Sequence, residues 1–175
     1  RVPDDLLRLS VGIEAVDDLI ADLEQALVGP VPNTRYGLEL VDEQIRYYRH
    51  RAPEYDEWFY RQGRYDYGPD HRRQWHHELA EAREALDAHR PSRRILELAC
   101  GTGLWTQLLA RYPGALTAFD VSNEVLARNR VRSKAVRYHQ CDIFRWMPEE
   151  RYDFVFFGFW LSHVPPSRFE QFWDQ

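Results

Sequence analysis

The sequence has few cysteines and no long apolar run. Both features restrict the classes of protein to which the chain can belong. Two cysteines in 175 residues provide no disulfide framework and fit a reducing compartment. No apolar run approaches the roughly 18 to 20 residues of a membrane span, and no signal peptide is visible. The net charge of −5 argues against a general nucleic-acid binder, which is usually basic. We therefore predict a soluble, cytoplasmic protein that binds neither membrane nor nucleic acid.

Several motifs that carry chemistry are also missing. The sequence has no GxxxxGK[ST] phosphate loop, and its histidines show no HExxH-type spacing, so we assign no metal site. It contains no internal repeat and no low-complexity segment. At 44% hydrophobic and 14% aromatic residues, the chain can still build a core, and its length suits one domain of ordinary size.

The most informative stretch is residues 94–106, RILELACGTGLWT. It begins with apolar residues interrupted only by Glu97, turns through Gly101-Thr102-Gly103 and enters a helix-like segment at Leu104. A buried strand, a glycine turn and a helix N-terminus together bring backbone close to a small ligand. We therefore predict a ligand site at this turn.

From residue 94 onward, strand-like and helix-like patterns alternate. The predicted strands are 94–99, 115–120, 135–140 and 152–160, and the predicted helices are 104–111, 123–131 and 166–173. Such alternation predicts parallel βαβ units with right-handed crossovers. The expected fold is α/β, a Rossmann-like doubly wound parallel sheet with strand order 3-2-1-4. Because the pattern stops at Gln175 inside a helix-like segment, we expect the sheet to be truncated after about four strands.

The residues before this core are predicted as a helical N-terminal extension. It comprises a strand-helix unit over 1–28, a proline- and glycine-rich linker over 29–37, and a helical, aromatic cover over 38–93. Within the cover, a helix over 70–89 places on one face Trp75, Leu79, Ala82 and Leu86. The aromatic stretch between Pro53 and Pro69 is not typical of a regular core element. A packed surface loop and a lid over a pocket are both open interpretations.

Acidic residues stand at the ends of three predicted strands. Glu97 precedes the glycine turn, Asp120 ends the second strand, and Asp142 follows the third. Ligands of a doubly wound sheet bind outside the carboxyl ends of its strands, so these acids should converge on one site. Each of the two aspartates has a structural alternative, since Asp120 could cap the next helix and Asp142 could be a turn residue. Glu97 is harder to explain structurally, because an acid in an apolar strand is costly unless it is paired.

The residue at position 106 bears on the kind of ligand. The dinucleotide fingerprint GxGxxG would place its third glycine there, and this sequence has Thr106. The absence of that third glycine argues against a nicotinamide or flavin cofactor. Glu97 points in the same direction, because an acid so near the turn would repel phosphates and suits a ligand that carries an ammonium group.

Four segments together resemble the class I S-adenosylmethionine-dependent methyltransferases: ILELACGTG, LTAFDVS, CDIF and YDFVFFGFWLSHVP. The resemblance covers about residues 45–175. It implies that S-adenosylmethionine is the cofactor and that its methyl group passes to an acceptor, which we expect to be a small molecule. The sequence does not identify that acceptor.

The resemblance also implies a role for each matching position. Glu97 would receive the methionine ammonium group, directly or through water. Asp120 would accept both ribose hydroxyls, and Asp142 would accept the adenine amino group with Ile143 against the ring. The other implied cofactor residues are Ala99, Gly101 and Gly103 along the methionine portion, Phe157 and Gly158 beside the sulfonium, and Tyr55 and Tyr60 in the N-terminal cover.

His163 and the two cysteines complete the set of candidate reactive residues. His163 follows the fourth predicted strand, where the family places acceptor-side residues; it is either a general base or a structural histidine that bonds backbone. Cys100 and Cys141 follow the first and third strands, which lie two spacings or about 9 to 10 Å apart in this strand order. This exceeds the disulfide reach of about 7 Å between Cα atoms, so we predict free thiols.

A second resemblance concerns only the first 28 residues. RVPDDLLRLSVGIEAVDDLIADLEQAL resembles the C-terminal end of the PLP-dependent Cys/Met-metabolism enzymes. The family's substrate-carboxylate arginine corresponds to Arg8, but the PLP lysine and the cofactor domain are absent from this sequence. We interpret this piece as the tail of a fused or truncated upstream PLP-dependent domain, with Arg8 a solvated or interface residue.

Two other functions remain as alternatives. One is a nicotinamide-dependent Rossmann oxidoreductase. The other is a non-catalytic fragment, or the tail of a fused PLP-dependent enzyme with a decayed methyltransferase half. The complete set of cofactor motifs argues against decay.

Overall fold

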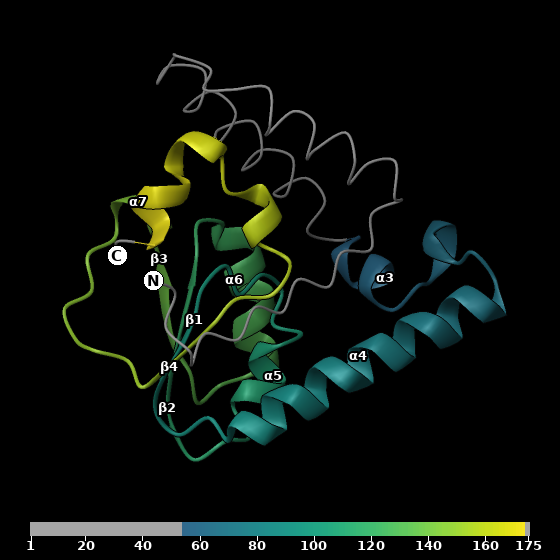
Figure 1. Cartoon of the computed structure of the whole chain (residues 1–175), viewed down its shortest axis with the longest axis horizontal. Helices are drawn as coiled ribbons and strands as arrows, with labels where there is room; N and C mark the ends of the chain where they lie inside the picture. The colour runs from purple at the N-terminus through teal and green to yellow at the C-terminus, as the bar shows by residue number, and fades with distance from the viewer. Residues whose placement is uncertain (1–53, 174–175) are drawn as a thin grey trace.

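The computed structural model describes residues 54–173, which form a parallel sheet with helices on both faces (Figure 1). The strands are β1 (Arg93–Glu97), β2 (Gly114–Asp120), β3 (Arg137–Gln140) and β4 (Phe154–Phe156). Their order is β3-β2-β1-β4, and every neighbouring pair is parallel. The predicted doubly wound sheet of order 3-2-1-4 is confirmed. The predictions for residues 1–28, Arg8 and the linker 29–37 lie outside the described residues.

The helices alternate with these strands as the sequence predicts. The α-helices are α3 (Tyr55–Phe59), α4 (Pro69–His89), α5 (Thr106–Leu109), α6 (Asn123–Arg132) and α7 (Phe169–Trp173). Short 3-10 helices are η1 (Gly63–Tyr65), η2 (Ile143–Arg145), η3 (Leu161–His163) and η4 (Pro166–Arg168). Between residues 54 and 173, every helix is too short or too polar to cross a lipid bilayer.

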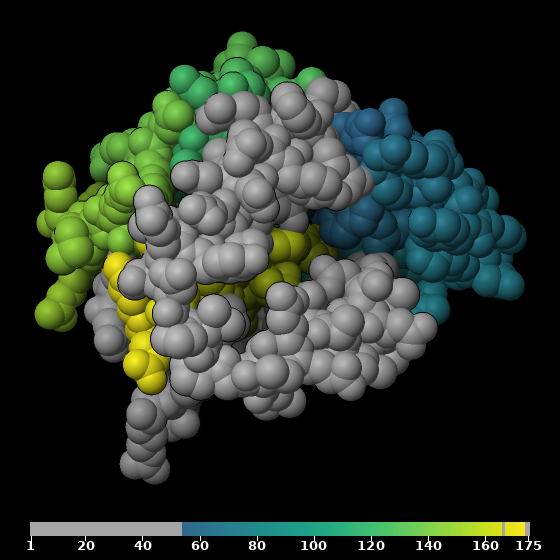
Figure 2. Space-filling view, turned by 90° about the horizontal axis from the view of Figure 1, so that it is seen from above, coloured from purple at the N-terminus to yellow at the C-terminus, as the bar shows by residue number. Residues whose placement is uncertain are grey.

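Side chains that alternate along the strands supply a separate core to each face of the sheet. Ile95 and Leu116 enter a cluster with residues of α3, α4 and α5. Leu96 and Phe119 point to the opposite face and enter a cluster with residues of η2 and α7. Seen from above, α3 and α4 (blue to teal) lie on one side, the α6–β3 region (green) lies on the other, and C-terminal residues (yellow) lie between them (Figure 2).

Helix α4 has the apolar face that its periodicity predicts. Trp75, Leu79, Ala82 and Leu86 are all at most 4% exposed. The helix begins at Pro69, where the missing backbone N–H costs nothing, and ends at His89, after which Arg90 takes the left-handed conformation with φ 49°. Its buried face packs against Ile95, Leu116 and Phe156 of the sheet.

The aromatic stretch before α4 differs from its prediction. Phe59 is 2% exposed and belongs to the main core, where Trp58, Trp75, Trp105 and Phe159 pack around it in edge-on and tilted contacts. The prediction that this stretch contains no regular core element is therefore wrong. Aromatic rings of this size bury enough surface for even a five-residue helix to be held by packing.

Two element lengths also differ from prediction. The apolar run 152–160 forms a strand only over Phe154–Phe156, because the backbone turns away at Gly158 and at Phe159, where φ is 58°. Within this strand, Val155 is 44% exposed. The helix predicted over 104–111 is α-helical only over Thr106–Leu109. Apolar composition alone does not show where a strand or helix ends.

Trp75→Phe is expected to lower the free energy of unfolding by about 1 to 2 kcal/mol. The indole Nε1 of Trp75 donates to the buried carbonyl of Phe59 at 2.6 Å. Phenylalanine would keep an aromatic ring, although a smaller one, and would leave that carbonyl without its donor. Chemical denaturation followed by circular dichroism measures the change. The matched control is Tyr67→Phe, which should change the free energy of unfolding by less than about 0.5 kcal/mol because Tyr67 is 71% exposed. Equal stability of Trp75→Phe and the unsubstituted chain would contradict the expectation.

Candidate functional site

The carboxyl edge of the sheet gathers backbone of unusual conformation around the glycine turn. Ala99, Gly101 and Gly103 have positive φ angles of 50°, 53° and 95°. A side chain at Gly101 would meet nothing within 4 Å, so the space in front of this residue is open. Positive φ is costly for alanine and tends to occur where function requires it. The turn therefore presents strained backbone to an open space at the predicted site.

Asp120 lies beside this turn at the end of β2. Its Oδ2 accepts from the backbone N–H of Gly101 at 2.9 Å, and its Oδ1 accepts from that of Ser122 at 2.9 Å. Burial raises the pKa of Asp120, although the backbone donors of Ser122, Gly101 and Val121 oppose the rise. Each oxygen keeps a second lone pair. Ser122, not Asp120, caps α6, since its hydroxyl accepts from the Val125 N–H at 3.4 Å.

Glu97 is 2% exposed and belongs to a buried polar network. The hydroxyl of Thr106 donates to Glu97 Oε2 at 2.6 Å, and Asn129 Nδ2 donates to that same hydroxyl oxygen at 2.8 Å. Asn129 Oδ1 in turn accepts from the Tyr138 hydroxyl at 2.8 Å. Burial raises the pKa of Glu97 to about 8, the Thr106 hydrogen bond lowers it in part, and the charge of Asp120 adds to the rise. Thr106, where a fingerprint glycine would stand, thus supports the acid in the strand.

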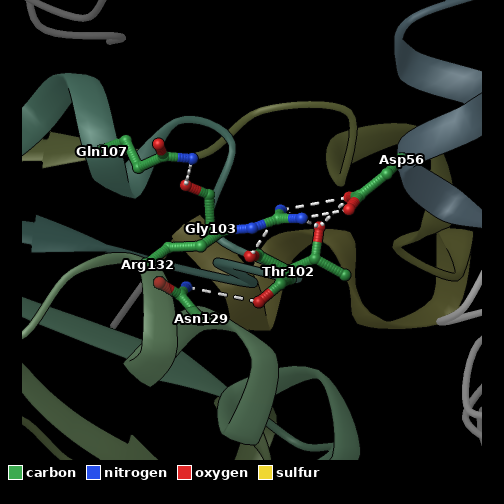
Figure 3. Close-up of polar contacts among 7 residues, drawn as sticks. Asp56, Thr102, Gly103, Gln107, Asn129 and Arg132 are labelled. Atoms are coloured by element: carbon green, nitrogen blue, oxygen red, sulfur yellow. Dashed lines mark hydrogen bonds and ion pairs between the residues drawn. The ribbon is translucent and has the colours of Figure 1, made fainter.

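Side chains hold three successive carbonyls of the turn (Figure 3). Asn129 Nδ2 donates to the Gly101 carbonyl at 3.3 Å, and Arg132 Nη1 donates to the Thr102 carbonyl at 2.9 Å. Gln107 donates to the Gly103 carbonyl from its backbone at 3.1 Å and from its side chain at 3.3 Å. The orientation of the whole turn is therefore set by α5 and α6.

Asp142 and Ile143 lie where the chain leaves β3. Asp142 Oδ1 accepts from the Phe144 N–H at 3.0 Å and caps η2, which is the turn role considered as the alternative to ligand binding. Its Oδ2 lies 3.4 Å from Arg145 Nε. Ile143 is buried at 7% exposure. A further role of Asp142 toward a ligand stays a prediction.

The residues that follow β4 lie at the same carboxyl edge of the sheet, on the side of β1 away from β2. Phe157 is buried against Phe172 and Trp173. A side chain at Gly158 would come within 3.0 Å of Trp105 Nε1, so glycine there lets the indole ring approach the backbone. His163 is half-buried in η3, and its role stays a prediction.

Two tyrosines of the predicted cover lie on and after α3. Tyr55 is half-buried and its ring contacts that of Trp58 at 5.3 Å, whereas Tyr60 is 42% exposed. Between them, Asp56 accepts from the Thr102 hydroxyl at 2.8 Å and pairs with Arg132. The cover helix is thus bonded directly to the glycine turn.

Sequence reasoning missed the side chains that build this surrounding shell: Asp56, Gln107, Asn129, Arg132 and Tyr138. One signal was present, because Asn129 and Arg132 are three residues apart and so share one face of α6. The face of that helix could have been predicted to meet the turn. Asp56, 46 residues before Thr102, had no local signal.

Both cysteines are free thiols, as predicted. Burial is the main cause that raises the pKa of each, and the charge of Asp120 adds to both shifts. The pKa of Cys141, which is half-buried, rises to about 11. No group of three or more His, Cys, Asp or Glu side chains within residues 54–173 is arranged to hold a metal ion.

Known families match this edge of the sheet. The profile of the family described as "Methyltransferase domain" matches residues 95–175. Two solved structures of DhpI, titled as its complexes with SAH and with SAM and HEP, superpose with TM-scores of 0.67 and 0.65 at 38% identity. They cover 81% of this chain. The chain carries a class I S-adenosylmethionine-dependent methyltransferase domain.

Curated relatives of the methyltransferase domain match over shorter stretches. Trans-aconitate 2-methyltransferase of Methylobacterium nodulans is 39% identical over 74 residues, which are 41% of this chain and 29% of that protein. The chain spans 63% and 60% of the two DhpI structures, so it spans less than two thirds of each of these relatives. Outside the methyltransferase domain, residues 1–28 match the family described as "Cys/Met metabolism PLP-dependent enzyme". There, cystathionine gamma-synthase of Mycobacterium tuberculosis is 77% identical over 27 residues, which are 15% of this chain and 7% of that enzyme.

Proposed function

We propose that the chain binds S-adenosylmethionine at the carboxyl edge of the sheet and transfers its methyl group to a small-molecule acceptor. The observation that carries the proposal is Asp120, whose two oxygens each hold one backbone N–H and keep a lone pair beside the open space at Gly101. A pair of ribose hydroxyls fits such an acceptor. The half-buried position of Asp120 leaves it within reach of a ligand.

The other site residues divide along the two halves of this cofactor. Glu97 faces the amino-acid half, and the strained backbone of Ala99, Gly101 and Gly103 lines it. On the nucleoside half, Asp142 and Ile143 hold the adenine. The residues assigned to the sulfonium and to the cover are Phe157, Gly158, Tyr55 and Tyr60.

S-adenosylmethionine, when bound, supplies a methyl group on a sulfonium whose leaving group is a neutral thioether. No acid is therefore needed to expel that group. The chain's own residues orient the two reactants and exclude water, which can contribute roughly 7 to 11 kcal/mol to lowering the barrier. Phe157 and the aromatic rings near Gly158 provide the water-excluding wall. His163 serves as a base where the acceptor must lose a proton.

For the acceptor, we propose a small organic acid. Support comes from the relatives named trans-aconitate 2-methyltransferase, although they match only over part of their length. A carboxylate is already anionic at neutral pH, so such an acceptor would attack without a base. His163 would then bind or position the acceptor. The nicotinamide alternative loses support, since Thr106 is bonded to Glu97 where the dinucleotide fingerprint needs glycine.

The division of the chain is also part of the proposal. We assign residues 1–28 to the end of a PLP-dependent domain fused upstream, 29–37 to a linker, 38–93 to the cover and 94–175 to the cofactor-binding core. The match of residues 1–28 to PLP-dependent enzymes supports this assignment. The open reading frame upstream of Arg1 tests it directly, because it must then encode a PLP-binding lysine.

Asp120→Ala is expected to weaken S-adenosylmethionine binding at least tenfold, since about two charge-assisted hydrogen bonds are lost. Isothermal titration calorimetry measures the dissociation constant. Asp153→Ala is the matched control, because Asp153 pairs with Arg94 at the opposite end of β1. No binding by the unsubstituted chain, or binding that Asp120→Ala leaves unchanged, would refute the proposal. Binding of a nicotinamide cofactor in the same assay would favour the oxidoreductase.

A further inference from the structure

Three elements that are distant in sequence meet at Asp56. This residue belongs to α3, Thr102 to the middle of the glycine turn, and Arg132 to the last position of α6. Asp56 Oδ1 accepts from Thr102 Oγ1 at 2.8 Å and from Arg132 Nη1 at 3.1 Å, and Asp56 Oδ2 pairs with Arg132 Nη2. Arg132 Nη1 also donates to the Thr102 carbonyl at 2.9 Å. The close-up shows the guanidinium between the carboxylate and the turn (Figure 3).

This contact differs from the ion pairs on the rest of the described surface. The side chains of Arg132 and Asp56 are 26% and 23% exposed, whereas those of Arg73 and Asp70 in α4 are 71% and 89% exposed. Thr102 is 1% exposed. Burial works to raise the pKa of Asp56, but the hydrogen bonds from Arg132 and Thr102 outweigh it and the pKa is lowered. A bidentate, partly buried pair is stronger and more specific in geometry than an exposed one.

Helix α3 depends on such contacts. It has five residues and no side-chain hydrogen bond at its N-cap, and a helix of that length is not stable by itself. Phe59 anchors its C-terminal end in the core, and Asp56 anchors its first turn to the glycine loop. Tyr55, the adjacent residue, is therefore oriented by the same contact.

We propose that Asp56, Thr102 and Arg132 form a latch that holds the cover helix α3 against the cofactor seat. The three are positioning residues: they fix Tyr55 and the carbonyl of the central turn residue and thereby set how long the cofactor stays bound. This role rests on the proposed function, because the seat must hold S-adenosylmethionine. The coupling runs both ways, so a bound cofactor also stabilises the latch.

The first test needs no cofactor. Asp56→Asn and Arg132→Gln should each speed amide hydrogen exchange of Tyr55–Phe59 about tenfold, measured by mass spectrometry of the full chain. Thr102→Val should do the same to a smaller extent, and Thr102→Ser, which keeps the hydroxyl, should restore protection. Arg73→Gln breaks the exposed pair in α4 and should leave exchange of α3 unchanged. Unchanged exchange in both Asp56→Asn and Arg132→Gln would overturn the latch.

The second test measures the cofactor. In stopped-flow experiments, Asp56→Asn and Arg132→Gln should release S-adenosylmethionine about tenfold faster. The KM for the cofactor should rise with little change in kcat, because neither residue touches the reacting atoms. The double variant should lose less than the sum of the two single variants, since both break the same ion pair. Faster amide exchange with an unchanged release rate would overturn the role of the latch in cofactor retention. Failure of the unsubstituted chain to bind S-adenosylmethionine would refute the proposed function, and the exchange experiment would still decide whether the latch exists.

Discussion

Binding of S-adenosylmethionine is expected to release a proton near neutral pH. Burial raises the pKa of Glu97 to about 8 in the ligand-free chain, so about nine in ten of these carboxyls carry a proton at pH 7. An ammonium group beside Glu97 stabilises the carboxylate and lowers that pKa. Bound cofactor therefore displaces close to one proton at pH 7 and none well above pH 8, and affinity rises as pH increases from 6 to 8.

Calorimetry in phosphate and in Tris, buffers of different ionisation enthalpy, measures the number of protons released. Glu97→Gln should lose the proton release that comes from this carboxyl, and its affinity should be about tenfold weaker or more. Glu150→Gln is the control, because Glu150 is a half-exposed acid that pairs with Arg94 and Arg137 away from the site. Equal proton release by Glu97→Gln and the unsubstituted chain would show that another group titrates.

The same carboxyl also affects stability. Its pKa in the folded chain lies above the value of about 4.3 of an unfolded glutamate, so the folded state binds more protons between these values. The free energy of unfolding must then fall as pH rises from about 4.5 to 8, by roughly 3 to 5 kcal/mol from this residue alone. Glu97→Gln should flatten that part of the pH profile in urea denaturation.

Gly103→Ala is expected to destabilise the chain by about 2 to 5 kcal/mol and to reduce cofactor affinity by more than about 100-fold. At φ 95° an added Cβ is strained, and it would lie 2.3 Å from Asn129 Oδ1. Asn129 is fully buried and cannot move aside freely. Its oxygen accepts from Tyr138, and its nitrogen donates to Thr106 and to the Gly101 carbonyl. A displaced Asn129 would release both the turn and the hydroxyl that supports Glu97.

Gly68→Ala separates strain from collision. Gly68 has a similar φ of 100°, but an added Cβ there meets nothing within 4 Å. The free energy of unfolding of Gly68→Ala should therefore fall only by the cost of backbone strain, about 1 to 2 kcal/mol. Asn129→Ala combined with Gly103→Ala should cost less than the sum of the single changes, because the collision is gone. Thermal and urea unfolding measure all four chains, and equal losses from Gly103→Ala and Gly68→Ala would contradict the explanation.

The parts of the fold that the sequence predicted are those set by local periodicity and topology. Alternating strands and helices predicted a parallel sheet, and the doubly wound fold expected for it supplied the order β3-β2-β1-β4. Helix α4 buries the face that its spacing predicts. Strand β4 was predicted too long because the prediction carried the strand through Gly158, whereas its pairing with β1 stops at Phe156, opposite Glu97.

The supporting side chains of the site could not be predicted in the same way. Asp56 meets Arg132 across 76 positions of sequence, and Asn129 meets Thr106 across 23. Such pairs depend on how three elements pack, which periodicity does not encode. Thr106 was noticed only as a missing glycine, and the structure adds that its hydroxyl is bonded to Glu97.

The two thiols beside the site have a consequence for the chemistry. Cys100 adjoins Gly101, and Cys141 adjoins Asp142, so both residues follow strands at the carboxyl edge of the sheet. A thiolate is the strongest nucleophile that a protein side chain offers, and an electrophilic methyl donor held near one would be consumed by it. Burial is the main cause that raises the pKa of both groups, and the charges of Glu97 near Cys100 and of Asp142 near Cys141 add to the rise, which favours the neutral thiols. Burial of the two thiols thereby keeps their reactive thiolate form rare beside an electrophilic methyl donor.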